Sequence, residues 1–349
     1  MVIAVFNLGL LLGDAAVLWL AARSRRLRTS LGATLGLLLL GSLLAFVAGV
    51  NLWERLRLLF FVVFLHAPLV GLGLAWLLRG SAPRTGRTAL VISLVLLAMA
   101  LDGGFIEPNW LEVSHLTVAD PRIPRALRLA VLTDFQTDHI GGFERRVLRR
   151  ILAEKPDVVL LLGDYIQTRR SEYDAVNRQF HDLLAAEHFS APLGVYAVQG
   201  NVDPQRWQDA FTGLPITILP ATSTFEAGGV AFTGLAVDAS FDPRLQLPRP
   251  GDGFHVTFGH APNYALGTID ADLLLAGHTH GGQLRLPGIG AVFNLSLVPR
   301  SWSAGVTRLS DGRTLVVARG TGMERGRAPR ARFLCRPEVV VVDLKPAAP

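Results

Sequence analysis

Cysteine is almost absent from this 349-residue chain, which has only Cys335. A single cysteine excludes a disulfide within the chain, and we expect the thiol to pack in the interior. Lysine is also scarce, so arginine carries nearly all of the positive charge, and the net charge is +6. This excess favours cytoplasmic loops and anionic partners such as phosphates or lipid headgroups. The chain has no internal repeat and no nucleic-acid motif, so we expect no nucleic-acid partner.

Charged residues are rare in the first third of the chain, where long apolar runs replace them. Half of all residues are hydrophobic, the mean hydropathy is +0.37, and a bilayer span needs about 20 apolar residues. Runs of that length lie at about 2–22, 30–52, 58–78 and 88–106. The first run lacks the basic segment and cleavage site of a signal peptide. We therefore expect residues 1–106 to be an all-α transmembrane region of about four helices, with Asp102-Gly103-Gly104 interrupting the last one.

The placement of arginine predicts how such a region is oriented. The connections at 23–28 and 79–87 are rich in arginine, whereas no Lys or Arg lies between the last span and Arg122. Because basic loops stay in the cytoplasm, four spans would put the amino terminus and the rest of the chain outside it, on an inner or plasma membrane. Three spans would reverse the side. Asp14 and His66 lie inside spans, and we expect Asp14 either to pair within the helix bundle or to lie near one face of the membrane.

Polar residues that bind metals follow five strand-like apolar runs in the remainder of the chain. They are Asp134 and Gln136 after 127–133, Asp164 after 157–162, Asn201 after 194–199, His260 after 254–259, and His278 and His280 after 273–276. Ligands collect at the carboxyl ends of strands in α/β sheets, so we expect these side chains to converge at one edge. Carboxylates mixed with imidazoles fit a pair of divalent ions that clamps a phosphate and generates a hydroxide nucleophile.

The order of these motifs resembles the calcineurin-like metallophosphoesterase superfamily. Its signature is Asp-x-His, Gly-Asp, Gly-Asn-His-(Asp/Glu), a later His and Gly-His-x-His, and the resemblance covers about residues 126–345. The ending Gly-His-Thr-His-Gly-Gly-Gln looks like the membrane-anchored bacterial branch. The resemblance implies two divalent ions (manganese, iron or zinc), with Asp164 bridging both, Asp134, Gln136 and His280 completing the first site, and Asn201, His260 and His278 completing the second. It also implies that Asp164, Asn201 and His260 act in catalysis.

The resemblance also implies the fold, an α/β sandwich of two mixed β-sheets flanked by helices. We expect this domain at 126–349, behind a tether at 107–125 in which residues 112–118 are either linker or an edge strand. Apolar residues at helical spacing predict helices over 143–154 and 172–187. Apolar runs predict later strands over 216–219, 230–235, 314–317 and 339–343.

Two positions depart from the family signature. Gln136 stands where the family has a histidine, and a carbonyl oxygen holds a transition metal more weakly than imidazole does. Val202 replaces the histidine that in the family polarises the phosphate or protonates the leaving group, and losing a general acid typically costs about 10²–10⁴ in rate. His139 is either a substitute ligand or acid, or an exposed loop residue. We expect Asp203 to stabilise the turn after Asn201.

The sequence therefore predicts a membrane-anchored, metal-dependent hydrolase of a phosphate ester or pyrophosphate. Anchoring in the lipid bilayer favours a lipid or envelope substrate. Arg319 and the run from Arg325 to Arg332 are either substrate-binding groups or solvated surface. Because Gln136 and Val202 weaken the signature, the alternative is a degenerate, non-catalytic membrane protein that binds metal or phosphate. A transporter with an appended domain has less support, because the spans are few and contain few polar residues.

Overall fold

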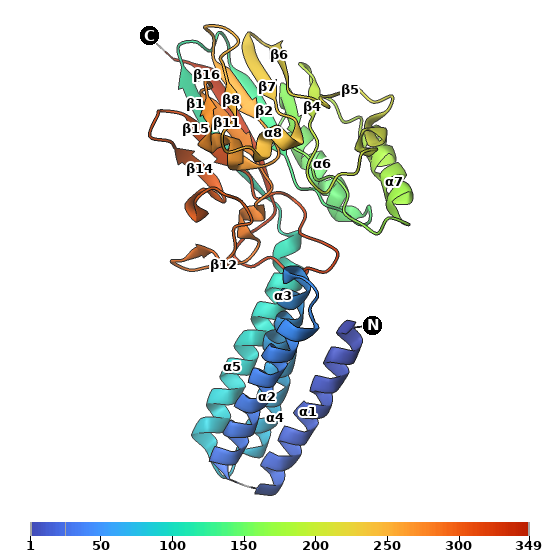
Figure 1. Cartoon of the computed structure of the whole chain (residues 1–349), viewed down its shortest axis with the longest axis vertical. Helices are drawn as coiled ribbons and strands as arrows, with labels where there is room; N and C mark the ends of the chain where they lie inside the picture. Colours follow the sequence, from blue (N-terminus) through green and yellow to red (C-terminus); the bar gives the residue numbers. More distant parts are fainter. Residues whose placement is uncertain (1, 25, 348–349) are drawn as a thin grey trace. The chain divides into compact units, whose positions relative to one another are not determined.

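The computed structural model describes residues 2–24 and 26–347, and the chain divides into two compact units. The first unit holds the residues up to Phe105 together with Arg327–Arg330, and the second holds Ile106–Gly326 with the residues from Ala331 onward. Among the described residues, the first unit is helical and the second contains the strands (Figure 1).

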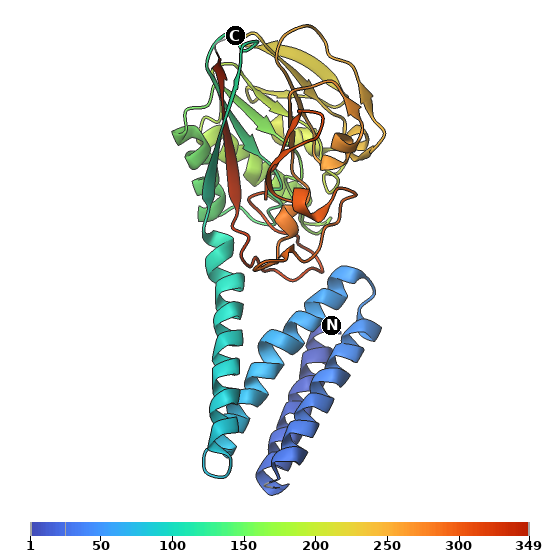
Figure 2. The same cartoon turned by 90° about the vertical axis from the view of Figure 1, so that its left-hand side faces the viewer.

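The first unit is built from long apolar helices (Figures 1 and 2). In chain order they are α1 (Val2–Ser24), α2 (Leu27–Ala48), α3 (Leu52–Phe61), the π-helical turn η1 (Val62–His66), α4 (Ala67–Leu77) and α5 (Pro83–Leu101). Because α3, η1 and α4 are continuous, four helical stretches among the described residues are long and apolar enough to cross a bilayer, which confirms the expected number of apolar helices. The Asp102-Gly-Gly sequence does not end the last helix, which continues as a π-helical turn, η2 (Asp102–Ile106), and a 3-10 turn, η3 (Glu107–Asn109).

These helices expose large apolar side chains and bury a small polar cluster. Leu12, Leu40 and Trp76 are each more than half exposed, as expected of helix faces that meet lipid rather than water. Inside the bundle, His66 Nδ1 lies 2.7 Å from Asp14 Oδ2, and His66 Nε2 lies 3.0 Å from Asn7 Oδ1. The expected pairing of Asp14 within the bundle is confirmed, and the helices have the character of a membrane anchor.

The second unit contains two six-stranded sheets. The first has the order β1-β16-β2-β3-β4-β5 and the second the order β14-β15-β11-β9-β7-β6. The first sheet consists of β1 (Glu112–Asp120), β2 (Leu127–Leu132), β3 (Val158–Leu161), β4 (Val195–Ala197), β5 (Ile216–Ile218) and β16 (Glu338–Pro346). The second consists of β6 (Ser223–Ala227), β7 (Val230–Gly234), β9 (His255–Phe258), β11 (Leu273–Ala276), β14 (Gly305–Arg308) and β15 (Thr314–Val317).

Both sheets are mixed. β2 to β5 are parallel to one another, and β16 runs antiparallel to β2. β1 pairs in parallel with β16 at the edge of the sheet, so residues 112–120 form a strand; the pair is teal and dark red in Figure 2. In the second sheet β7, β9, β11 and β15 are parallel, while β6 and β14 pair antiparallel at its two edges. The predicted sandwich of two mixed sheets is confirmed.

The central strands are buried on both faces, which explains why they appear in the sequence as continuous apolar runs. On one face of β2, Leu129 packs with Phe232 of the second sheet. On the other face, Ala130 packs with Phe180 and other apolar residues of α6 (Gly142–Ala153) and α7 (Tyr173–Ala186). The helices therefore cover the outer face of the first sheet, and the main core lies between the two sheets.

Short elements connect these strands. They are η4 (Trp207–Phe211), α8 (Val237–Phe241), β8 (Gln246–Leu247), η5 (Pro262–Leu266), β10 (Thr268–Ile269), η6 (His280–Gly282), β12 (Arg285–Leu286), β13 (Gly290–Ala291) and η7 (Arg300–Trp302). β8 pairs with β10 and β12 with β13, each as a separate two-stranded ladder.

Candidate metal centre

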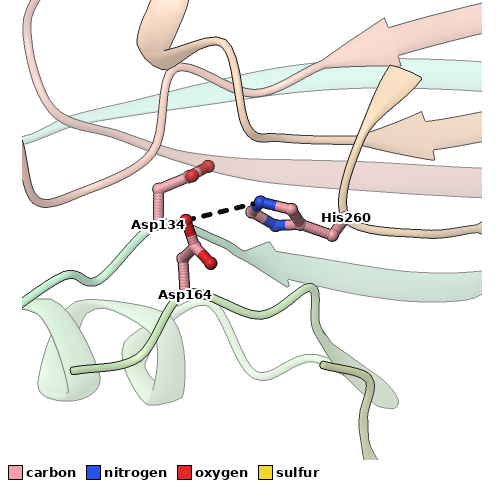
Figure 3. A group of neighbouring side chains, drawn as sticks. All are labelled: Asp134, Asp164 and His260. Carbon is pink, nitrogen blue, oxygen red and sulfur yellow. Dashed lines mark ion pairs between the residues drawn. The ribbon is translucent and has the colours of Figure 1, made fainter. Parts of the chain in front are cut away.

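Strand ends from both sheets bring polar side chains to one place. Asp134 follows β2, Asp164 follows β3 and His260 follows β9. All three side chains are buried, and one ligand atom of each lies within 4.8 Å of the others (Figure 3). β2 and β3 are parallel, with Leu132 opposite Leu161, so both carboxylates lie at the carboxyl end of the first sheet. Such a group has the spacing and donor types that bind a divalent ion.

His260 lies between the carboxylate of Asp164 and the backbone. Its Nδ1 lies 2.9 Å from the Leu162 carbonyl oxygen, and its Nε2 lies 2.9 Å from Asn201 Oδ1 and 3.4 Å from Asp164 Oδ2. Burial alone lowers the pKa of His260, but the carboxylates, Asp164 first and then Asp134, outweigh it and raise this pKa to about 9. The negative potential that favours an imidazolium here would also favour a metal cation.

Residues that follow β2 and β11 orient the Asp134 carboxylate. Its Oδ2 accepts hydrogen bonds from the Thr133 hydroxyl, at 2.8 Å, and from the backbone N–H of His278, at 2.9 Å. Its Oδ1 lies 3.5 Å from His280 Nε2. A Cβ at position 277 would lie 2.1 Å from the Thr133 hydroxyl oxygen, so only glycine allows this approach.

His278 and His280 are held in the form that binds metals. Burial lowers the pKa of each imidazole to about 4, so both are neutral at pH 7. The His278 ring stands edge-on to His260, with ring centroids 5.1 Å apart, and also contacts Phe241. The structure therefore brings His278 and His280 to the same place as Asp134 and His260.

Three buried polar atoms in this place have no hydrogen-bond partner among the described residues. They are Asp134 Oδ1, Gln136 Oε1 and His280 Nδ1. Buried polar atoms in native proteins are almost always paired, and each exception calls for an explanation. A cation bound among carboxylate, carbonyl and imidazole donors satisfies this need, so the residues present fit a metal site.

The backbone is also unusual at these positions. Five of the expected ligands have positive φ angles, a region that residues other than glycine rarely occupy. They are Asp134 (49°), Gln136 (34°), Asp164 (57°), His278 (68°) and His280 (50°). Each such residue costs on the order of 1–3 kcal/mol, and such strain clusters at functional sites. We infer that this conformational cost is tolerated because it orients the ligand side chains towards the centre.

The turn after β4 is tied to Asp164. The Asp203 carboxylate accepts hydrogen bonds from the backbone N–H groups of Asp164, Tyr165 and Gly200, at 2.7–2.9 Å. The expected role of Asp203 in stabilising this turn is confirmed. The backbone N–H of residue 202 in turn donates to Asp164 Oδ1, at 2.9 Å. This network holds Asn201 beside His260.

Gln136 contacts a carboxylate that the sequence did not reveal. Its Nε2 donates to Asp164 Oδ2, at 3.1 Å, and lies 3.5 Å from Glu324 Oε2. Burial, followed by repulsion from Asp164, raises the pKa of Glu324. Glu324 belongs to no motif, and only its nearness to an arginine- and glycine-containing stretch could have drawn attention to it. His139 is exposed and interacts with Asp138, so its ring stays outside the centre.

The arginines near the carboxyl terminus bind backbone and carboxylates. Arg319 pairs with Glu338 and Glu112. Arg332 is completely buried and donates to backbone carbonyl groups, including that of Cys335, so neither expected role, substrate contact or solvated surface, is right for it. Cys335 is buried, as expected.

Comparison with known proteins agrees with this geometry. The family model of calcineurin-like phosphoesterases matches residues 127–282, the segment from β2 to the second histidine of Gly-His-x-His. The chain contains a calcineurin-like phosphoesterase domain. Metallophosphoesterases of this family hydrolyse phosphoric ester bonds, and this domain is such a hydrolase.

The similarity to individual proteins of this family extends over most of the chain. It is similar to an uncharacterised metallophosphoesterase, YkuE, of Bacillus subtilis, with 26% identity over 71% of this chain and 92% of the relative. It is similar to the phosphodiesterase YaeI of Escherichia coli, with 29% identity over 69% of this chain and 90% of the relative. A shorter similarity, 30% identity over 28% of this chain and 30% of the relative, links it to the UDP-2,3-diacylglucosamine pyrophosphatase LpxG of Chlamydia trachomatis.

Proposed function

We propose that this protein is a membrane-anchored phosphoesterase that cleaves a phosphate ester or pyrophosphate at a centre for two divalent ions. The observation that carries the proposal is the buried group of Asp134, Asp164 and His260, with unpaired buried atoms on Asp134 and on its neighbours Gln136 and His280. Two ions, when bound, supply Lewis acidity and a nucleophile at neutral pH.

The chain's own residues would divide into two ligand sets. Asp134, Gln136 and His280 would hold the first ion, and Asp164 would lie between the two ions. Asn201, His260 and His278 would hold the second ion, with His260 oriented through its Nδ1 by the Leu162 carbonyl group. A second partner that fixes the other ring nitrogen is the usual arrangement for a metal-binding histidine. Asn201 would also donate an N–H to the phosphate.

A cavity beside the centre offers a place for the leaving group. It has a volume of about 600 Å³, and its wall includes Val202, Tyr173, Arg170 and Arg206. Val202 cannot donate a proton, so substrates whose leaving group needs no protonation are favoured, such as pyrophosphates and aryl esters. Arg170 suits a leaving group that is itself anionic, whereas Arg206 in the same wall is paired with Asp209, at 2.7 Å.

The apolar helices favour a substrate that is itself in the membrane. The similarity to LpxG, a UDP-2,3-diacylglucosamine pyrophosphatase, supports a lipid-linked pyrophosphate as the substrate class. The arginine-rich connections support a domain outside the cytoplasm. In spheroplasts, a carboxyl-terminal tag should be accessible to an added protease; a tag protected until lysis would contradict this orientation.

The test of the activity compares three substrates with the full-length, metal-loaded protein in detergent. They are a lipid-linked pyrophosphate in mixed micelles, a soluble aryl phosphodiester and an alkyl phosphomonoester. We expect the fastest hydrolysis with the lipid-linked pyrophosphate, a slower reaction with the aryl phosphodiester, a much slower one with the alkyl phosphomonoester, and loss of activity in Asp164→Asn. Equal rates for lipid and soluble substrates would remove the lipid part of the proposal, and an inactive metal-loaded protein would remove the enzymatic part.

The alternative function is non-catalytic binding of metal or phosphate. It is favoured by Gln136 and Val202, which leave the family's ligand and acid positions without histidine. The double substitution Gln136→His with Val202→His separates the two functions. Activity in the double variant together with a silent parent would support the binding protein, whereas an active parent would exclude it.

A further inference from the structure

One loop from the far end of the chain lies along the end of β2. The backbone N–H of Thr321 donates to the Thr133 carbonyl oxygen, at 3.2 Å, and that of Gly322 donates to the Asp134 carbonyl oxygen, at 2.7 Å. Nearly 190 residues separate these partners in the sequence, so a tertiary contact alone brings the loop to the metal centre. The loop consists of residues 319–325, which follow β15, and lies outside the family match at 127–282.

The loop packs so closely against the residues after β2 that no side chain fits at Gly322. A Cβ at Gly322 would lie 2.2 Å from the Phe135 carbonyl oxygen. Beneath the loop, the buried guanidinium of Arg332 donates to the carbonyl oxygens of Arg319 and Gly320, at 2.8 and 3.2 Å, and to that of Gly322. These hydrogen bonds fix the loop in place, so its side chains are presented to the centre in a defined way.

Glu324 is the carboxylate that this loop presents. Its Oε1 accepts a hydrogen bond from Gln167 Nε2, at 2.7 Å, and its backbone N–H donates to Gln283 Oε1, at 2.9 Å. Its Oε2 lies 3.5 Å from Gln136 Nε2, and Asp164 Oδ2 lies 3.1 Å from the same nitrogen. Two carboxylates thus share one amide NH₂ group, while the amide oxygen of Gln136 is buried without a partner.

The Gln136 NH₂ group occupies a position between two carboxylates that would also suit a cation. The NH₂ group carries the partial positive charge that the two carboxylates attract. Turning the amide by half a rotation about its last bond exchanges its oxygen and nitrogen. The amide oxygen would then point towards the two carboxylates. A cation bound between these three groups would give both carboxylates and the Gln136 oxygen a partner of opposite charge.

We propose that Glu324 is a ligand of the first metal ion, supplying a carboxylate where the family signature has a histidine. The inference rests on the proposed function of the centre. It makes the first site a set of carboxylates from Asp134, Asp164 and Glu324, a carbonyl from Gln136 and one imidazole. Oxygen-rich sites favour harder ions, so this site would take Mn²⁺ in preference to Zn²⁺, relative to a site with a second imidazole.

The test measures metal binding rather than activity. The full-length protein in detergent is freed of metal and titrated with Mn²⁺, which is followed by the electron paramagnetic resonance signal of the free ion, and Zn²⁺ competition gives the relative affinities. We expect two Mn²⁺ sites in the native chain. Glu324→Gln keeps an acceptor for Gln167 but loses the charge, and should weaken one site about 10–100-fold while leaving the other unchanged. Glu226→Gln, at an exposed position on β6, is the matched control and should change neither site.

A rescue variant separates a lost ligand from a disturbed fold. In Gln136→His with Glu324→Gln, the imidazole should restore two sites and shift the first towards Zn²⁺. Two Mn²⁺ sites of native affinity in Glu324→Gln would overturn the inference, and so would a weakened site that the histidine fails to restore. If Glu324→Gln changes nothing while Asp164→Asn loses metal, only this inference fails. If the native chain itself binds no metal, the proposed function fails with it.

Discussion

Two single residues determine which group binds the first metal ion and whether the leaving group can receive a proton. Gln136 and Val202 replace two histidines, yet Gln136 still lies 3.1 Å from Asp164 and keeps a buried oxygen free of partners. The loss of imidazole at position 136 is thus compatible with a working site. The Val202 side chain, by contrast, cannot donate a proton to a leaving group.

Restoring the acid at this position should change which substrates are cleaved. We expect Val202→His to raise kcat/KM for alkyl phosphodiesters by up to about 10²-fold, with a much smaller gain for aryl phosphodiesters, because only poor leaving groups need the proton. The measurement is the ratio of the two kcat/KM values. An equal change for both substrates would mean that the histidine acts on binding alone. Val202→Asn, which is polar but does not ionise, is the control.

Removing the carboxylate of Asp203 should weaken the fold around the centre. Asp203→Ala leaves buried backbone N–H groups of Asp164, Tyr165 and Gly200 unpaired. We expect a loss of about 1–3 kcal/mol in the free energy of unfolding, read from urea denaturation. Asp182→Ala, at an exposed position on α7, should cost little. Native stability in Asp203→Ala would mean that water replaces the carboxylate at no cost.

At the scale of elements, the turn between β10 and β11 is held by charge. The Asp272 carboxylate accepts hydrogen bonds from the His255 backbone N–H, at 2.9 Å, from Arg249, at 2.7 Å, and from Arg122, at 2.8 Å. Burial alone raises the pKa of Asp272, but these donors, led by Arg249, lower it overall. The carboxylate ties the start of β11 to β9 and to the segment before β2.

This depressed pKa gives a pH dependence of defined sign. The stability that ionised Asp272 contributes is present above its unfolded pKa, near 4, and is lost as the pH falls through the lower, folded value. We expect Asp272→Asn to lower the free energy of unfolding at pH 7 by about 1 kcal/mol or less, because solvent screens the pair. Its stability should also fall less between pH 5 and pH 3 than that of the native chain. Parallel pH profiles for the two proteins would contradict this, and Asp252→Asn, at an exposed position, serves as the control.

The sequence predicts the long elements well and the short ones poorly. The buried strands β2, β3 and β11 are predictable because apolar residues fill both faces, and α6 because its apolar residues recur at helical spacing. For residues 112–118 the sequence leaves linker and strand open, because β1 is an edge strand and its strand conformation depends on pairing with β16, far away in the sequence. The two-residue strands β8, β10, β12 and β13 have no pattern long enough to detect.

The same limit applies to the centre. Asp134, Asp164 and His260 were predictable because each follows an apolar strand, and the strand ends meet. Glu324 was not, because its loop has no periodicity and reaches the end of β2 only through tertiary hydrogen bonds and the buried Arg332.

For the whole molecule, apolar helices and a phosphoesterase domain occur in one chain. The helices have the length and composition of membrane spans. The domain matches its family and has, at its strand ends, a buried group of Asp134, Asp164 and His260 that could hold a metal ion. Under the proposed function, the helices would hold the catalytic domain near a membrane, where lipid substrates are concentrated. Hydrolysis in such a domain requires metal at the centre.

The most direct test is therefore the metal content of the purified full-length protein. Elemental analysis after loading with manganese, iron or zinc should give two ions per chain. Asp164→Asn should reduce both, because Asp164 is the ligand placed between the two sites, while Asp252→Asn should change neither. Two ions in the native chain and fewer in Asp164→Asn is the result that the account predicts. No bound metal in the native chain, or two ions retained in Asp164→Asn, would contradict it.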